Sequence, residues 1–223
     1  MQYEVEMKAL LKNEQATKDL LGFLKKLDTS WVLLRKEKQL NHYFQFGDIL
    51  KLIGSLEDYL TTSDIKILNN IHNKATSVSV RTREKNGLTI IVVKGSMDKT
   101  DAVHSHKRME FEKELPIDIE DLDTTLINNG FSVEAKWSAT RKMYRFLDTT
   151  VDIMFTPGYG YVVEIEKLIY DESDIETARK DIKALMGKLG LETLSSARLG
   201  RMYNFYNNHW QEYYGTKKVF TID

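Results

Sequence analysis

The chain has 223 residues, of which 42% are hydrophobic and 29% are charged, and its formal net charge is -1 at pH 7. This length suits one large domain or two small ones, and the near balance of charge argues against a general nucleic-acid-binding protein, which would be basic. Because the chain has no cysteine, disulfides, zinc–thiolate sites and thiol catalysis are excluded. Neither a run of about 18 apolar residues nor a signal-peptide pattern is present, so we expect a cytoplasmic protein without membrane contact.

The first predicted element is a strand over residues 2–10, in which charged and apolar residues alternate. Successive side chains of a strand point to opposite faces. Glu4, Glu6 and Lys8 therefore share one face, with neighbours about 6.6 Å apart, while Val5 and Met7 pack behind them. Two carboxylates at this spacing can hold divalent metal ions through their oxygens.

Local signals predict several helices and turns. Asn13 is expected to cap a helix over 14–28, and Ser63 a helix that ends near residue 72. Asn86-Gly87 lies between two alternating runs and predicts a hairpin, and Ser173-x-x-Glu176 predicts a capping box at the start of a helix. Further helices are expected over 48–60, from Asp118 to Asn129 and over about 196–214.

Further strands are expected over 38–46, 77–84, 88–94, 107–115, 131–138, 140–147, 150–155 and 161–169. About eight strands with helices at their ends predict one α+β domain built around an antiparallel sheet.

The alternation of the first strand returns in Arg81-Thr82-Arg83, Glu110-Phe111-Glu112 and Glu164-Ile165-Glu166. Taken singly, such strands are typical of an antiparallel sheet with one wet side. Repeated Arg-x-Arg and Glu-x-Glu on different strands instead favour a closed sheet with charges inside. Such an interior must hold water, ions or a charged ligand, because burying unpaired charge is too costly.

The chemistry of these charges indicates the ligand. Arginine forks bind phosphate oxygens in pairs, and Mg²⁺ and Mn²⁺ prefer oxygen ligands and bridge to phosphates. A hydrated barrel with both kinds of side chain would therefore suit a metal-complexed polyphosphate.

The order of these motifs resembles that of the CYTH domains, also called triphosphate tunnel metalloenzymes. The resemblance covers about residues 2–190 and begins with Glu4-x-Glu6-x-Lys8, which matches the ExExK motif of that family. The later motifs follow in the family's order: Arg81 and Arg83; Lys94; Arg108 with Glu110 and Glu112; Arg141 with Tyr144; Asp152; and Glu164 with Glu166.

The resemblance implies an eight-stranded antiparallel β-barrel, the triphosphate tunnel, with helices packed outside and at the ends. It implies a single domain over residues 1–223, with a helical insertion at 48–76 and a C-terminal helix extension at 191–223. The insertion is longer than usual for the family, and we expect it either to cover the tunnel mouth or to form a contact surface.

The resemblance also implies the site residues. Phosphate contacts fall to Lys8, Arg81, Arg83, Lys94, Arg108 and Arg141. Ligands for Mg²⁺ or Mn²⁺ are Glu4, Glu6, Asp152, Glu164 and Glu166. Glu110 and Glu112 join these acids or orient the arginines, and Glu4, Glu6 and Lys8 form the catalytic set. One family cation is missing, because Ala139 stands where a lysine is usual, unless Arg145 or Lys142 replaces it.

The predicted function is metal-dependent hydrolysis of inorganic triphosphate or of a nucleoside or other organic triphosphate. The alternative is an adenylyl cyclase of the same family, which would make cyclic AMP and pyrophosphate from ATP. A third reading is a non-catalytic binder of polyphosphate or nucleotide, which the missing lysine at Ala139 favours. In each case the partner is a small molecule, with no membrane and no general nucleic-acid binding.

Overall fold

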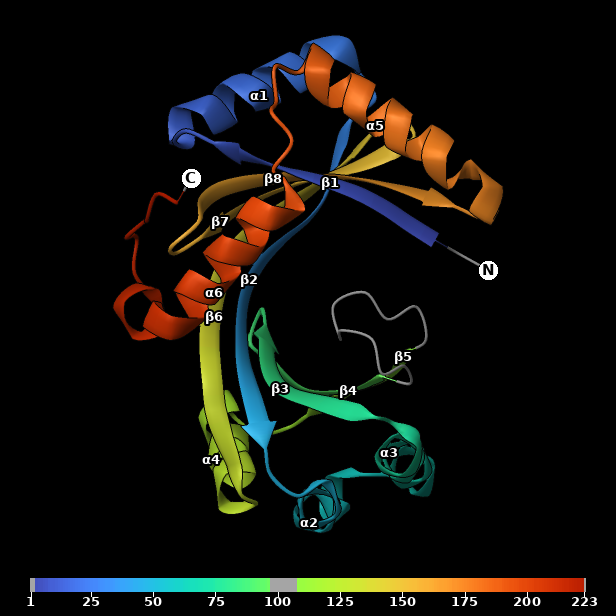
Figure 1. Ribbon diagram of the computed structural model, residues 1–223, viewed down its shortest axis with the longest axis vertical. Helices are drawn as coiled ribbons and strands as arrows, with labels where there is room; N and C mark the ends of the chain where they lie inside the picture. Colours follow the sequence, from blue (N-terminus) through green and yellow to red (C-terminus); the bar gives the residue numbers. More distant parts are fainter. Residues whose placement is uncertain (1–2, 97–107, 223) are drawn as a thin grey trace. The chain divides into compact units, whose positions relative to one another are not determined.

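The computed structural model describes residues 3–96 and 108–222, without the side chain of Arg108. Eight strands form one sheet in the order β1-β8-β7-β6-β2-β3-β4-β5, with β1 and β5 at its two ends. The strands are β1 (Tyr3–Leu11), β2 (Val32–Phe46), β3 (Ser77–Lys85), β4 (Leu88–Ser96), β5 (Arg108–Leu115), β6 (Phe131–Phe146), β7 (Thr149–Thr156) and β8 (Gly160–Ile169) (Figure 1). The predicted α+β class and the eight-stranded antiparallel sheet are confirmed, but the expected closure is not, because β1 and β5 do not pair in the described residues.

The helices lie between groups of these strands along the chain and after the last strand. They are α1 (Glu14–Leu27), α2 (Ile49–Ser55), α3 (Thr62–Lys74), α4 (Ile119–Asn128), α5 (Ile175–Lys188) and α6 (Ser196–Tyr213), with short 3₁₀ turns η1 (Glu57–Tyr59) and η2 (Glu172–Asp174). None of the helices in the described part of the chain is long and apolar enough to cross a membrane.

The chain divides into two compact units. The first unit comprises Met1–Lys38 and Ser138–Asp223, and the second comprises Gln39–Trp137. Each unit has its own hydrophobic core. The single domain over residues 1–223 stays a prediction.

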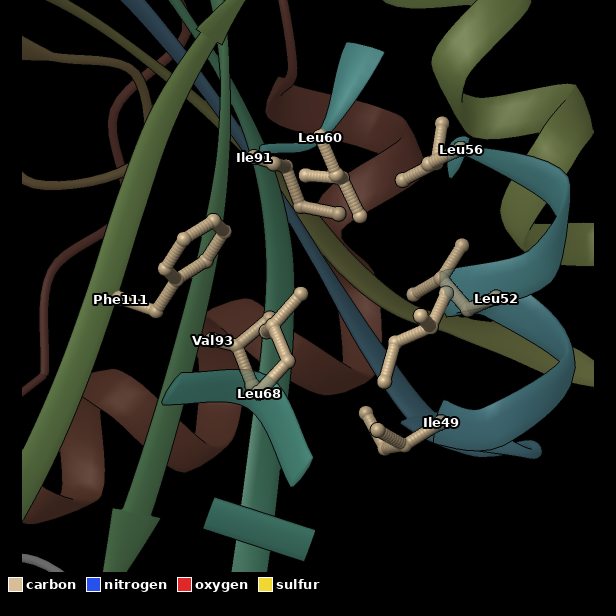
Figure 2. Close-up of a pocket in the computed structure, with 9 residues that line it drawn as sticks. Ile49, Leu52, Leu56, Leu60, Leu68, Ile91, Val93 and Phe111 are labelled. Carbon is tan, nitrogen blue, oxygen red and sulfur yellow. The ribbon is translucent and has the colours of Figure 1, made fainter. Parts of the chain in front are cut away.

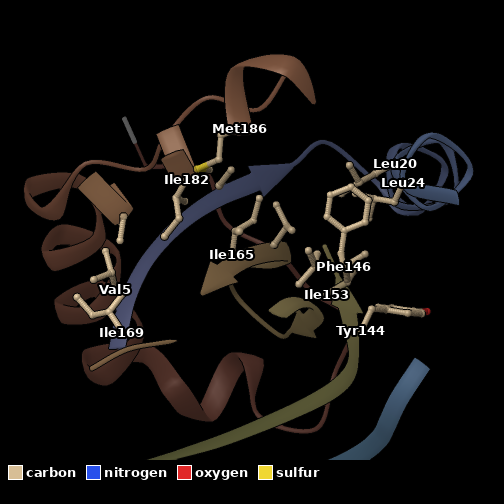
Figure 3. Packing of buried hydrophobic residues seen from close by; sticks show 14 residues of the cluster. Val5, Leu20, Leu24, Tyr144, Phe146, Ile153, Ile165, Ile169, Ile182 and Met186 are labelled. Carbon is tan, nitrogen blue, oxygen red and sulfur yellow. The ribbon is translucent and has the colours of Figure 1, made fainter. Parts of the chain in front are cut away.

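The core of the first unit lies between two helices and one face of its strands. Leu20 and Leu24 of α1 and Ile182 of α5 pack against Val5 of β1 and Ile165 of β8, all of them buried (Figure 3). This face takes up the apolar side chains that alternate with the charged ones in β1 and β8. The opposite face of the same strands is therefore left with the charges.

The helical insertion forms part of the core of the second unit. Leu52 of α2 and Leu68 and Ile71 of α3 are buried against Val80 of β3 and Val93 of β4. The described insertion thus covers the apolar face of this part of the sheet.

A small apolar cavity of about 10 Å³ remains between these helices and the strands (Figure 2). Its lining contains Leu56, Leu60 and Leu68 from the insertion, with Ile91 and Phe111 from the sheet. Such a volume holds about one water at most, and an apolar lining offers that water no partners. The cavity is therefore a packing gap and not a ligand site.

Two tight turns depend on residues with positive φ. Asn86 and Gly87 have φ values of 52° and 84° and join β3 to β4, which confirms the predicted hairpin. At the β7–β8 turn, Gly158 has φ 86°, and a Cβ there would lie 2.6 Å from the ring of Tyr206 on α6. The aromatic side of α6 packs on this turn, where Tyr206 and Tyr159 meet edge to face.

Four details of the predicted elements were wrong. Strand β2 begins at Val32 instead of residue 38, and β6 is one continuous strand where two were expected. The cap of α3 is Thr61, which forms a capping box with Asp64, so Ser63 is not the cap. Ser173 likewise does not cap α5, because the N-cap of α5 is Asp174 and Ser173 lies inside η2, where it donates to Asp171.

Candidate active site

The first unit presents a charged face formed by β1, β8, β7 and β6, here called the acidic face: Glu4, Glu6, Lys8, Arg141, Asp152, Glu164 and Glu166. The strand register brings these residues together. Lys8 pairs with Glu164, which pairs with Asp152, and Glu6 pairs with Glu166. Directly opposed side chains of neighbouring strands lie about 5 Å apart at Cβ, so residues far apart in sequence become neighbours here.

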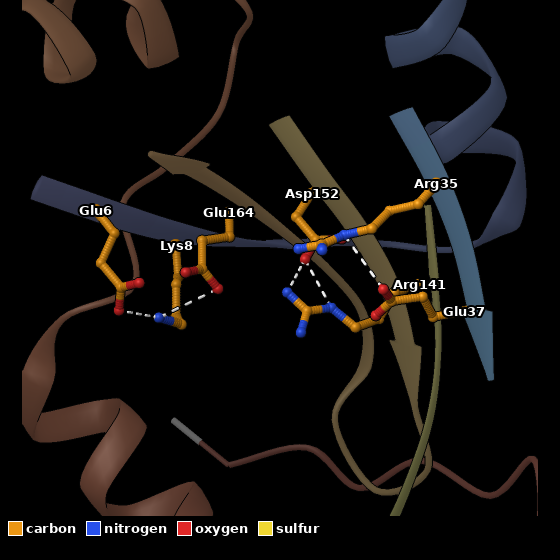
Figure 4. A network of polar contacts seen from close by, with 7 residues as sticks. All are labelled: Glu6, Lys8, Arg35, Glu37, Arg141, Asp152 and Glu164. Atoms are coloured by element: carbon orange, nitrogen blue, oxygen red, sulfur yellow. Dashed lines mark hydrogen bonds and ion pairs between the residues drawn. The ribbon is translucent and has the colours of Figure 1, made fainter. Parts of the chain in front are cut away.

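Lys8 binds two carboxylates of this face (Figure 4). Its Nζ forms an ion pair with Glu6 and lies 3.3 Å from Oε2 of Glu164. The predicted catalytic set is thus brought together for Glu6 and Lys8, while Glu4 lies one pleat further along β1, opposite Leu168 of β8.

Burial and negative neighbours change the protonation of the acidic face. Burial raises the pKa of Glu164 to about 8, and a hydrogen bond with Glu6 acts in the same direction. That bond lowers the pKa of Glu6 in turn. Burial and the charges of Glu4, Glu6 and Asp152 also raise the pKa of Glu166. The face therefore has more carboxylates than its cations neutralise.

A second ion pair lies beside the first. Arg141 on β6 donates from Nε to Oδ2 of Asp152 over 2.7 Å, and its terminal nitrogen binds the same oxygen. Asp152 is only 3% exposed, yet its Oδ1 has no hydrogen-bond partner among the described residues. A buried carboxylate oxygen without a partner is costly, which makes it a place where a cation or a donor can bind.

Arg35 and Glu37 on β2 join this network, although neither was predicted as a site residue (Figure 4). Arg35 Nε lies 3.2 Å from Oε1 of Glu37, whose side chain is 6% exposed. Burial acts to lower the pKa of Arg141, but Asp152 and Glu164 raise it, and Glu37 is close enough to raise it further. Arg35 thus places a further cation near this face. Lys142 and Arg145, the suggested substitutes for the missing lysine, are both exposed.

The acidic face offers oxygen donors to a divalent ion. Among residues 3–96 and 108–222, no three acidic or histidine side chains converge as a ready-made metal site. The donor set still fits, because oxygen ligands suit Mg²⁺ and Mn²⁺, Asp152 has an unpartnered buried oxygen, and Glu164 holds a proton that a metal would replace. Asp152, Glu6 and Glu164 would hold such an ion once their present ion pairs open.

The second unit presents a different face, here called the arginine face: Arg81, Arg83, Lys94, Glu110 and Glu112 on β3, β4 and β5. Arg81 lies over the ring of Tyr43, 4.7 Å from its centre, and donates to the Tyr43 hydroxyl over 3.3 Å. Arg83 donates from Nε to Oδ1 of Asn41 over 2.9 Å and forms an ion pair with Glu112, also at 2.9 Å. Both guanidinium groups are thus held by side chains from neighbouring strands.

The remaining cation of this face, Lys94, also meets an acid. Lys94 Nζ lies 2.6 Å from Oε1 of Glu110. Burial would raise the pKa of Glu110, but the hydrogen bond from Lys94 and its charge outweigh burial and lower it. Arg108 begins β5, pairing with Ser96 in the backbone ladder, and its side chain lies outside the described residues. In this state Glu110 and Glu112 neutralise cations that were predicted to bind phosphate.

A hollow opens beside Glu6 and Lys8 in the first unit. The segment after α5 forms its wall, because Leu194 N donates to the carbonyl of Lys8 over 2.7 Å and Thr193 bridges to Ala9. Arg179 of α5 and Leu199 of α6 complete the lining. The C-terminal extension thus covers part of the edge of β1 and leaves a recess next to the ExExK residues.

Comparison with known proteins identifies the family to which this chain belongs. The sequence matches the CYTH domain over residues 2–200, and the chain therefore belongs to the CYTH domain family. That family is divalent-metal-dependent and binds triphosphate substrates. A search of curated proteins found no match.

Solved structures share the fold at low sequence identity. A conserved hypothetical protein from Pyrococcus furiosus is 20% identical with a TM-score of 0.54, over 85% of this chain and 92% of that one. The PH1819 protein from Pyrococcus horikoshii is 23% identical with a TM-score of 0.52, over 86% and 93%. A candidate adenylate cyclase from Vibrio parahaemolyticus is 17% identical with a TM-score of 0.53, over 91% and 98%.

Proposed function

We propose that this protein hydrolyses a triphosphate, inorganic or organic, with the help of Mg²⁺ or Mn²⁺. Two features of the acidic face support this most directly. The buried Oδ1 of Asp152 has no partner among the described residues, and burial raises the pKa of Glu164 to about 8, so that this carboxyl keeps its proton at neutral pH. Both features are relieved by a divalent cation. Membership of a metal-dependent, triphosphate-binding family points to the same reaction.

The proposed roles follow the two faces. On the acidic face, Glu4, Glu6, Asp152, Glu164 and Glu166 hold the metal, and Lys8 and Arg141 bind phosphate oxygens. On the arginine face, Arg81, Arg83, Lys94 and Arg108 bind phosphate, while Glu110 and Glu112 release those cations when the ligand arrives. A bound divalent ion would neutralise phosphate charge and favour attack by water.

The protein's own side chains contribute by positioning the phosphates and by neutralising their charge, as is usual in phosphoryl transfer. Water attacks the terminal phosphorus, the bond from that phosphorus to the bridging oxygen breaks, and phosphate and the shortened chain leave. The proton lost by water passes to a carboxylate of the acidic face. A carboxylate that is not bound to the metal suits this role, because it must be unprotonated and within hydrogen-bond reach of the attacking water to accept the proton.

The test is phosphate release from tripolyphosphate, nucleoside triphosphates and thiamine triphosphate with each metal. Glu6→Gln removes one charge from the pair with Lys8 and should lower turnover about 100-fold or more, as expected when a metal site is damaged. Glu14→Gln on α1 is the control, because Glu14 is 64% exposed and its ion pair within the described part of the chain is with Lys18 on the same helix. Absence of phosphate release from every substrate would remove the proposal.

The second candidate is an adenylyl cyclase, the activity suggested for the Vibrio protein of the same fold. In that reaction the ribose 3′-hydroxyl attacks the α-phosphorus and pyrophosphate leaves. The recess lined by Leu194, Leu199 and Met7 beside Lys8 offers apolar surface that an adenine would need. Product analysis with ATP separates the two, because a cyclase yields cyclic AMP and pyrophosphate while a hydrolase yields ADP and phosphate.

A further inference from the structure

A buried polar network lies behind the arginine face, on the side of the sheet that α4 covers. Asp123 of α4 is 5% exposed and accepts hydrogen bonds from side chains of three strands. The Thr82 hydroxyl on β3 donates to its Oδ1 over 2.6 Å, while His42 Nδ1 on β2 and Lys136 Nζ on β6 lie 2.8 and 2.7 Å from its Oδ2. One carboxylate thus joins strands that lie far apart in sequence.

The strand register connects this network to the phosphate-binding arginines. His42 and Thr82 are direct partners in the β2–β3 ladder. The pairs on either side are Tyr43 with Arg81 and Asn41 with Arg83. Because side chains alternate between faces, the pair bound to Asp123 points back toward α4, and the two flanking pairs point to the opposite face. The Arg81–Tyr43 contact therefore lies on one side of the His42–Thr82 pair along the ladder, and the Arg83–Asn41 contact lies on the other side.

The network is not needed to fill space. At the next apolar pair of the same ladder, Phe44 and Val80 are buried without polar groups. Thr82 is 0% exposed and His42 is 2% exposed, so their polar atoms are far from water. Burial would raise the pKa of Asp123, but the hydrogen bonds from His42, Lys136 and Thr82 outweigh it and lower the pKa. A fully satisfied buried network of this kind fixes one arrangement of the strands.

We propose that Asp123 and Thr82 are positioning residues, which fix the register and the spacing of the Tyr43–Arg81 and Asn41–Arg83 pairs for phosphate binding. This inference takes the identity of the ligand, a triphosphate, from the proposed function. The positioning of Arg81 and Arg83 by the network does not depend on that function. Loss of the Thr82 hydroxyl leaves Oδ1 of Asp123 without this donor and removes the side-chain link from β3 to α4, while the link from His42 of β2 to α4 stays. The distances from Arg81 to Tyr43 and from Arg83 to Asn41, on the other face, are then no longer fixed.

The test compares three single variants of the full chain. Thr82→Val removes the hydroxyl and keeps the volume, whereas Thr82→Ser keeps the hydroxyl. The matched control is Thr89→Val, because Thr89 is a 5% exposed threonine of the neighbouring strand β4 in the same unit. Affinity for tripolyphosphate is measured by calorimetry with EDTA present, and the melting temperature is recorded for each variant.

Thr82→Val should weaken tripolyphosphate binding about fivefold, the effect of losing one buried hydrogen bond, whereas Thr82→Ser and Thr89→Val should stay within about twofold of the wild type. The NMR signal of the Arg83 Nε–H group, which donates to Asn41, should shift and exchange faster in Thr82→Val alone. If Thr82→Val does not fold, Thr82→Ala and Thr89→Ala replace the valine pair.

Two results would overturn the inference: equal weakening in the Thr82 and Thr89 variants, or an unchanged Arg83 signal together with unchanged affinity in Thr82→Val. If the wild type itself does not bind tripolyphosphate, the proposed function fails. The Arg83 signal in the ligand-free protein then still decides whether Thr82 positions the arginine.

Discussion

Lys8 and Glu164 are direct partners across the β1–β8 ladder, and Lys8 Nζ lies 3.3 Å from Oε2 of Glu164. The same lysine binds Glu6, which shares a hydrogen bond with Glu164. A single ammonium group therefore serves two carboxylates, one of which keeps its proton. This shortage of positive charge is the basis of the first prediction.

The first prediction concerns stability as a function of pH in the metal-free protein. Burial raises the pKa of Glu164 from 4.5 to about 8, so between these values the folded protein binds a proton that the unfolded chain has lost. Stability from this group is complete below pH 4.5 and is lost as pH rises toward 8. Glu164→Gln should therefore flatten the decline in the free energy of unfolding, measured by urea titration with EDTA. An unchanged slope in Glu164→Gln would contradict the assigned protonation.

The second prediction concerns the buried oxygen of Asp152. Asp152→Asn should lower metal-dependent phosphate release about 100-fold or more, because an amide is a poorer metal ligand than a carboxylate. Asp148→Asn on the neighbouring turn is the control, since Asp148 is 68% exposed and pairs with Lys167 at 2.7 Å. The measurement is the steady-state rate of phosphate release at saturating Mn²⁺. A rate for Asp152→Asn close to that of Asp148→Asn would exclude Asp152 as a metal ligand.

The third prediction separates two roles for Glu112. If Glu112 neutralises Arg83 in the ligand-free state, Glu112→Gln should tighten tripolyphosphate binding about two- to fivefold in EDTA, because an exposed ion pair contributes about 1 kcal/mol or less. Glu120→Gln, at an exposed position in the first turn of α4, should have no effect. Calorimetry provides the affinities. Weaker binding by Glu112→Gln only when metal is present would instead assign Glu112 to the metal.

The fourth prediction concerns the helical insertion. Leu68→Ala in α3 should lower the free energy of unfolding by about 2–5 kcal/mol, because Leu68 is 3% exposed and its loss leaves a cavity in the core of the second unit. Leu50→Ala in α2 should change it by about 0.5 kcal/mol or less, since Leu50 is 51% exposed. Chemical denaturation measures both. Equal effects of the two substitutions would contradict the described packing of the insertion.

Local patterns were enough to predict much of the fold. The alternation in β1, the Asn86-Gly87 turn and the cap at Asn13 were all confirmed, because each depends on residues within a few positions of one another. The start of β2 was missed. Arg35-Lys36-Glu37-Lys38 is charged at every position, so no apolar alternation marks it as a strand. Arg35 and Glu37 were lost from the predicted site for this reason.

Other features depend on contacts that no local pattern contains. Asp123 stands in a helix with acidic and polar neighbours, where exposure would be the ordinary expectation. Its burial follows from donors at positions 42, 82 and 136, which only the assembled strands bring together. In the same way, the cap of α3 was assigned to Ser63 by sequence, although backbone geometry selects Thr61.

The sequence by itself determined which charged residues occur on each strand and in what order, and this was sufficient to identify the family, because alternation and motif spacing are properties of the chain alone. The tertiary structure decided which charges pair, which carboxylate oxygen is left without a partner and which acid keeps its proton. The physical reason is that ion pairing and pKa depend on burial and on neighbours from distant strands, and these exist only after the strands have come into register.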